Sequence, residues 1–117
     1  MIELIKKLFP ICRSITGNGV RESLNIIKDY IPDLDVIEIP SGTQVYDWKI
    51  PKEWNIKDAY VADNQGNRII DFKLNNLHLV NYSIPVNCTM GWEELKKFIH
   101  TIPDKPDLIP YRTSYYN

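Results

Sequence analysis

The sequence has few of the residues that enzymes use to bind metals or activate nucleophiles. Its 117 residues include two histidines and two cysteines, and these four residues lie far apart along the chain. Zinc needs three or four His, Cys, Asp or Glu ligands brought together, often as a pair three or four residues apart. Neither CxxC nor the G-x-S-x-G of a nucleophile elbow occurs. We therefore predict no metal site and no catalytic residue in this chain.

The isolated histidines and cysteines have simpler structural explanations. His78 sits in an apolar, strand-like run, and His100 lies near a helix end, where its protonated form is favoured. Cys12 and Cys88 are 76 positions apart and belong to no metal-binding pattern. In a chain without an export signal, we expect both to be free, buried thiols.

Long apolar runs and an excess of one charge are also lacking. The longest apolar stretch near the N-terminus is LFPIC, far short of the roughly 20 residues of a membrane helix, and no small-residue cleavage site follows it. Fourteen basic against fifteen acidic residues give a net charge of −1. We expect no nucleic-acid partner, no membrane contact and a cytoplasmic location. A chain of this length can form an independent core.

The first third of the sequence has the period of helices. Residues 2–9 form an amphipathic pattern stopped by Pro10. A second pattern covers 18–31, with Asn18 as the predicted N-cap, and Pro32 closes it. Its apolar positions recur at helical spacing and are Val20, Leu24, Ile27 and Ile31. The preceding Gly-Asn-Gly could receive an anion at the helix N-terminus, but it lacks the lysine of a P-loop and the full G-x-G-x-x-G.

Beyond residue 35 the period drops to two, which favours strands. We expect strands at 36–39, 46–50, 54–61 and 77–86, and a hairpin within 58–72 whose turn contains Gly66. A further helix is expected at 90–101, capped by Thr89. The predicted fold class is α+β, with two N-terminal helices followed by a small, mainly antiparallel β domain with one further helix.

Aromatic residues concentrate in the segment 41–61, SGTQVYDWKIPKEWNIKDAYV. Its rings could stack on a sugar or a peptide, or they could fill the inner face of a small sheet. Burying one such ring contributes about 1.5–3 kcal/mol, so we favour the second interpretation. The residues that would contact a ligand or partner under the first are Trp48, Trp54, Tyr111, Arg112, Tyr115 and Tyr116.

Two motifs connect the sequence to a known family. The pattern P-S-G-T-x-V-x-D-W-x-x-P-x-E-W-N-I covers residues 40–56, and P-Y-x-T-S-Y-Y covers 110–116. With these motifs the chain closely resembles, over essentially its whole length, the N-terminal part of the aminopeptidase-like proteins of zinc-exopeptidase type, which are associated with polysaccharide-biosynthesis loci. The resemblance implies that residues 1–34 are the opening helices of a larger α/β peptidase-like domain. Residues 35–117 would be a small β-rich inserted domain, cut short at its C-terminal end.

The resemblance carries no zinc ligand onto this chain, because the family's metal-binding stretches lie in the later region. It implies a non-catalytic portion of a zinc-dependent hydrolase that shapes the substrate cleft, with zinc in the full-length parent and the remainder of the same chain as partner. We also expect the fragment to self-associate through uncovered apolar surface. Two alternatives stay open: a freestanding glycan- or peptide-binding module that uses the Trp and Tyr cluster, and an interaction domain that holds an oligomer together.

Overall fold

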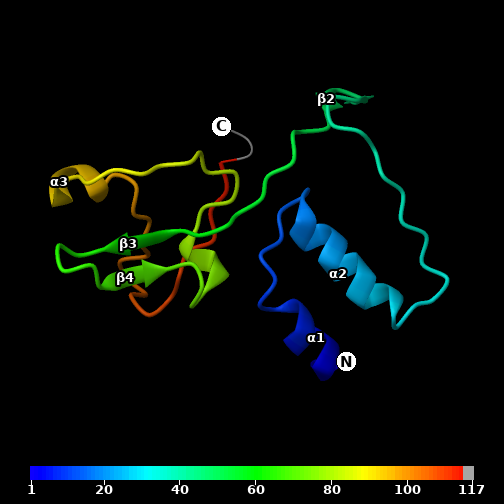
Figure 1. Ribbon diagram of the computed structural model, residues 1–117, viewed down its shortest axis with the longest axis horizontal. Coiled ribbons are helices and arrows are strands. Elements are labelled where there is room, and N and C mark those ends of the chain that lie inside the picture. Colours follow the sequence, from blue (N-terminus) through cyan, green and yellow to red (C-terminus); the bar gives the residue numbers. More distant parts are fainter. Residues whose placement is uncertain (115–117) are drawn as a thin grey trace. The chain divides into compact units, whose positions relative to one another are not determined.

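A computed structural model describes residues 1–114, and the chain divides into two compact units (Figure 1). The first unit is Met1–Asp58 and the second is Ala59–Asn117. Two helices come first, and two antiparallel hairpins and a short helix follow. This order confirms the predicted α+β fold class. The predicted domain boundary between residues 34 and 35 concerns a longer protein and stays a prediction.

Helices α1 and α2 open the first unit and pack against each other. Helix α1 spans Ile2–Leu8, one residue less than predicted, and ends just before Pro10, which cannot continue a helix. The Arg13 guanidinium then ties the two helices together. It donates to the Leu8 carbonyl at 2.6 Å and to the Ser23 hydroxyl of α2 at 3.3 Å. Ser23 is buried and in turn donates to the Gly19 carbonyl at 2.7 Å.

Helix α2 spans Asn18–Lys28 and ends before the predicted position 31. The backbone N–H groups of Tyr30 and Ile31 both donate to the Ile27 carbonyl at 2.9 Å, which turns the chain. Pro32 disfavours helical backbone at the residue before it and so accounts for the early end. The apolar stripe of α2 is half-buried and consists of Val20, Leu24 and Ile27.

The first hairpin lies within the aromatic segment. Strand β1, Gln44–Val45, pairs antiparallel with β2, Trp48–Lys49. Tyr46 has a φ of 51°, a left-handed conformation that suits a tight turn and not a strand. The predicted strand 46–50 is therefore wrong in its first half, because residues 46–47 form the turn between two shorter strands.

The predicted strand 36–39 does not form, and the predicted strand 54–61 forms only at its last two residues, which belong to strand β3 (Tyr60–Ala62) of the second unit. Residues 36–39 are rich in the β-branched residues of strands, yet no segment among residues 1–114 pairs with them, and the Ile37 side chain is 84% exposed. Residues 54–59 are also irregular. There the backbone N–H of Trp54 donates to the Thr16 hydroxyl at 3.3 Å, so this stretch bonds to the loop before α2 and not to a neighbouring strand.

The second unit begins with the predicted hairpin, which is confirmed. Strand β3, Tyr60–Ala62, pairs antiparallel with β4, Arg68–Asp71, with a register shift after Val61. The Asp63 carboxylate holds the turn by accepting from the backbone N–H groups of residues 65 and 67, both at 2.9 Å. Gly66 takes a φ of 86°, which only glycine adopts without strain.

The predicted central strand 77–86 is absent. A 3-10 turn, Asn76–His78, starts this segment instead, because the Asn75 side chain accepts from the Leu77 N–H at 3.0 Å. Further on, Tyr82 has a φ of 64°, which breaks an extended run. What remains is an isolated parallel bridge, in which the Ser114 N–H donates to the Asn81 carbonyl at 2.9 Å.

Helix α3 spans Trp92–Leu95, only four of the twelve residues predicted at 90–101. Its N-cap is Gly91 and not Thr89. A short helix is marginal unless an apolar face packs on a neighbour. The Trp92 side chain is 64% exposed and that of Phe98 is 66% exposed, so little packing holds the predicted second half in helical form.

Neither unit has a buried hydrophobic core. In the described part of the chain, the buried residues are Gly17 and Ser23, and no hydrophobic side chain is buried. The chain exposes 9901 Å² of surface. Two separate compact proteins of half its mass would together expose about 8000 Å². The expectation of an independent core is therefore wrong, and much apolar surface is left uncovered. Within residues 1–114, no helix has both the length and the apolar character needed to span a bilayer.

Candidate functional site

The histidines and acidic residues do not gather into a metal site. Among the residues that the structure describes, no group of three His, Cys, Asp or Glu side chains could hold a metal ion. The Nδ1 atom of His78 lies 2.9 Å from the Asp71 carbonyl oxygen, with which it shares a hydrogen bond. His100 is exposed. The described residues therefore do not fit the zinc that the resemblance implies for the longer protein.

The two thiols are free, but they differ in exposure. Cys12 is half-buried, and desolvation raises the pKa of its thiol. A raised pKa lowers the thiolate fraction and so opposes a nucleophilic role. Cys88 is exposed, so the prediction that both thiols are buried is wrong for this residue.

The aromatic residues predicted as ligand contacts divide between the two units. Trp48 lies on β2 and is 42% exposed, and Trp54 is half-buried in the same unit. Tyr111 and Arg112 lie in the second unit and are exposed. Tyr115 and Tyr116 lie outside the described residues. The preferred interpretation, in which the rings of 46–60 form a core, is wrong for this chain: the rings at 46, 48 and 60 are all exposed.

The start of helix α2, proposed as an anion site, is already occupied by a side chain. The side-chain amide oxygen Oδ1 of Asn55 accepts from the Asn18 N–H at 2.7 Å. The N-cap is therefore Gly17 and not the predicted Asn18, and the capping oxygen comes from 37 residues further along. A Cβ atom on Gly17 would lie 2.4 Å from the Trp54 carbonyl oxygen, so this approach needs glycine. The Gly-Asn-Gly segment serves packing here.

An ion-pair network strengthens the same junction. The Arg21 guanidinium pairs with the Glu53 carboxylate through both terminal nitrogens, one of them at 3.1 Å, and its Nε lies 3.5 Å from Glu38. The hydrogen bond from Arg21 lowers the pKa of the Glu53 carboxyl, and the Glu53 partner raises the pKa of Arg21. Both side chains are partly exposed, so water and salt screen this interaction. Its main effect is to fix the position of residues 53–55 on α2.

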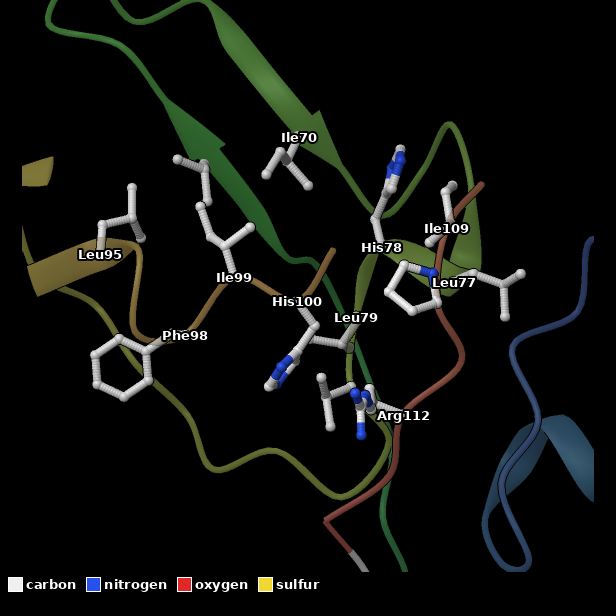
Figure 2. A pocket seen from close by; sticks show the side chains of 13 residues that line it. Ile70, Leu77, His78, Leu79, Leu95, Phe98, Ile99, His100, Ile109 and Arg112 are labelled. Carbon is white, nitrogen blue, oxygen red and sulfur yellow. The ribbon is translucent and has the colours of Figure 1, made fainter. Parts of the chain in front are cut away.

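A pocket in the second unit is a further concave feature of the described residues. It encloses about 200 Å³ and lies among the β3–β4 hairpin and the segments 77–80, 95–100 and 109–112 (Figure 2). All but three of its 13 lining residues are apolar. The three exceptions are His78, His100 and Arg112, so the pocket contains cationic and titratable groups but no acid.

Sequence reasoning identified Arg112 as a candidate but missed the pocket around it. The signal was present in the apolar residues of 90–101 and 77–86, which were assigned to a regular helix and a strand. Glu53 and Asn55 were also missed as the residues that lock α2, although both belong to the quoted motif. No local pattern tells which segment, far along the chain, will cap a helix.

Comparisons with known proteins identify relatives that are much longer. The chain is 61% identical over 113 residues to a Clostridium acetobutylicum protein named "Putative polysaccharide biosynthesis protein with aminopeptidase-like domain". That match covers 97% of this chain and 26% of the relative. A crystal structure of a "putative peptidase" from the same organism matches with a TM-score of 0.95 at 60% identity, over 98% of this chain and 27% of that one. The chain therefore spans about a quarter of the length of these relatives.

The relatives confirm the resemblance to aminopeptidase-like proteins that the motifs indicated. A family match covers residues 53–117, which is more than half of the sequence and includes the whole second unit. By that match, this chain belongs to the family described as a domain of unknown function, DUF2172.

Proposed function

We propose that this chain is the N-terminal and inserted-domain portion of a longer, zinc-dependent aminopeptidase-like hydrolase, and that it shapes the substrate cleft without performing catalysis itself. The observation that carries the proposal is the match over 97% of this chain to 26% of a relative named for an aminopeptidase-like domain. Zinc in such a hydrolase would polarise the scissile carbonyl and activate water. Since the described residues hold no ligand cluster, we assign zinc binding to the rest of the longer protein.

The uncovered apolar surface supports the role of a part within a larger fold. Ile2 on α1 is 67% exposed, and Ile37 in the irregular segment after α2 is 84% exposed. Apolar surface of this kind is stabilised by about 25 cal/mol for each Å² that a partner covers. The remaining three quarters of a longer chain would supply that cover, and cleft shaping would follow from the contact.

The test compares the full-length Clostridium acetobutylicum relative with this 117-residue chain. Bound zinc is measured by elemental analysis, and activity is measured as hydrolysis of aminoacyl anilides. We expect stoichiometric zinc and turnover in the relative and neither in the short chain. Zinc and turnover in the short chain would contradict the non-catalytic role. A relative that holds no zinc and cleaves no anilide would contradict the hydrolase assignment.

A binding module is the second candidate, and the exposure of two rings on one hairpin favours it. Tyr46 is 95% exposed and Trp48 is 42% exposed. A glycan- or peptide-binding role predicts that oligosaccharides or short peptides change the tryptophan fluorescence saturably. Trp48→Ala should abolish the change, and Trp92→Ala, in the other unit, should preserve it. A linear, unsaturable response in all three proteins would rule this module out.

A further inference from the structure

We propose that the pocket of the second unit receives one apolar side chain from the remainder of the longer peptidase-like chain, and that a carboxylate beside that side chain pairs with Arg112. The proposal rests on the proposed function in one respect: it takes this chain to be part of a longer protein. It adds the place of contact and the chemistry of the contacting group.

The size of the pocket favours a side chain over a free ligand. Pockets that bind small molecules usually enclose about 300–1000 Å³. This one encloses about 200 Å³ and is partly open to solvent. Its walls are apolar, and wall residues such as Leu77 and Phe98 are 41% and 66% exposed. A single inserted apolar side chain would cover these walls and remain attached to a larger covering surface.

The charges at the pocket specify what accompanies the apolar group. Among the residues that the structure describes, no side chain forms a hydrogen bond or an ion pair with Arg112. His78 is already bonded through Nδ1 to the Asp71 carbonyl. No acidic residue lines the pocket, so a covering surface with a carboxylate would supply the missing charge. A guanidinium is suited to that role because it can bind a carboxylate through two parallel hydrogen bonds.

A second copy of this chain is a poorer occupant of the pocket. In a two-fold symmetric dimer, the same patch meets itself. Arg112 of one copy would then lie near Arg112 of the other, and like charges at an interface oppose association. The relatives are about four times as long as this chain, at 26% and 27% coverage, so a covering segment from the same polypeptide is available.

The test uses hydrogen exchange measured by mass spectrometry on two proteins. One is the 117-residue chain, and the other is the Clostridium acetobutylicum relative with this chain in place of its matching quarter. We expect the backbone amides of 77–80, 95–100 and 109–112 to exchange at least tenfold more slowly in the longer protein. Equal exchange in both proteins would overturn the proposal. Protection that appears in the short chain and rises with its concentration would point to a second copy and would also overturn it.

Charge variants test the carboxylate. In the longer protein, Arg112→Glu should accelerate exchange at 95–100 several-fold, Arg112→Lys should retain most of the protection, and the matched control Lys105→Glu should have no effect. In the short chain, Arg112→Glu should change nothing. If Arg112→Glu leaves the exchange rates at 95–100 unchanged in the longer protein, the proposed ion pair between Arg112 and a carboxylate is wrong. Zinc content is measured on the same samples: loss of zinc with pocket protection intact contradicts the proposed function alone.

Discussion

At the scale of single residues, Asn55 caps helix α2, a role that its position in the sequence does not predict. Its side-chain oxygen caps α2 from 37 residues away, at 2.7 Å from the Asn18 nitrogen. Removing an N-cap oxygen costs about 0.5–2 kcal/mol. We therefore expect Asn55→Ala to lower the free energy of unfolding by about 1 kcal/mol, measured by urea denaturation with circular dichroism at 222 nm.

The matched control for this prediction is Asn64→Ala. Asn64 is exposed in the β3–β4 turn, and the same change there should stay within about 0.5 kcal/mol of the unmodified chain. Equal losses for the two variants would show that the contact between Asn55 and Asn18 contributes nothing to stability.

The Arg21–Glu53 pair makes stability depend on pH in a definite direction. The hydrogen bond from Arg21 holds the pKa of Glu53 below its ordinary value of 4.5 in the folded chain. The stabilising contribution is therefore complete above that ordinary value and is lost as pH falls through the lowered folded pKa. We expect the unfolding midpoints of the unmodified chain and of Glu53→Gln to differ at pH 7 and to approach each other as the pH falls through the lowered pKa of Glu53.

The control for the pH series is Glu94→Gln, on the exposed first turn of α3. Its midpoint should follow that of the unmodified chain at both pH values more closely than Glu53→Gln does. High salt should narrow the difference caused by Glu53→Gln at pH 7, since both partners are partly exposed. A difference that stays unchanged however far the pH is lowered below 4.5 would mean that the carboxylate charge is not its source.

At the scale of elements, the close approach between α2 and the loop before it reverses a common substitution effect. Replacing glycine by alanine inside a helix usually stabilises by about 0.5–1 kcal/mol. A Cβ atom on Gly19, however, would lie 2.0 Å from the backbone oxygen of Cys12. We expect Gly19→Ala to lower the thermal midpoint, and Asn25→Ala, at an exposed position of the same helix, to raise it slightly. A gain in both variants would show that the loop at Cys12 moves aside freely.

The elements that sequence patterns predicted correctly are the ones whose bonds are local. Helix α1, helix α2 and the β3–β4 hairpin each close their hydrogen bonds within a few residues, so period and turn chemistry suffice. Strands 36–39 and 77–86 failed because a strand needs a partner, and alternation shows only which face is apolar. The helix predicted at 90–101 is only four residues long for a related reason, since Trp92 and Phe98 remain 64% and 66% exposed and pack little against other residues.

For the candidate site, as for the elements, local features could be predicted from the sequence and contacts between distant segments could not. The prediction of no metal site rests on residue counts, because two isolated histidines offer few ligands, and it stays a prediction. The pocket could not be predicted, since it joins segments of a hairpin, a 3-10 turn, a short helix and the chain near 110. The capping by Asn55 is equally non-local. Arg112 was predicted as a possible ligand contact because it lies in the motif at 110–116, and its position at the pocket was not predicted.

At the scale of the whole molecule, the dominant property is the surface left uncovered. Neither unit buries a hydrophobic side chain in its described part, and the relatives continue for about three more lengths of this chain. Exposed apolar patches mark sites where another surface binds. When the 117-residue chain is isolated, the surface available to cover these patches is that of other copies, so the same physics that would join it to a longer protein predicts self-association.

We therefore expect the isolated chain to show a weight-average mass that rises above 13.7 kDa with concentration, measured by sedimentation equilibrium. Ile37→Lys should shift the association to higher concentration, because Ile37 is 84% exposed and a lysine there adds charge to an apolar patch. Asn25→Lys, which adds the same charge at an exposed polar position of α2, should leave the association constant unchanged. A mass that stays at 13.7 kDa across a hundredfold range of concentration would mean that the exposed apolar side chains do not drive contact between copies.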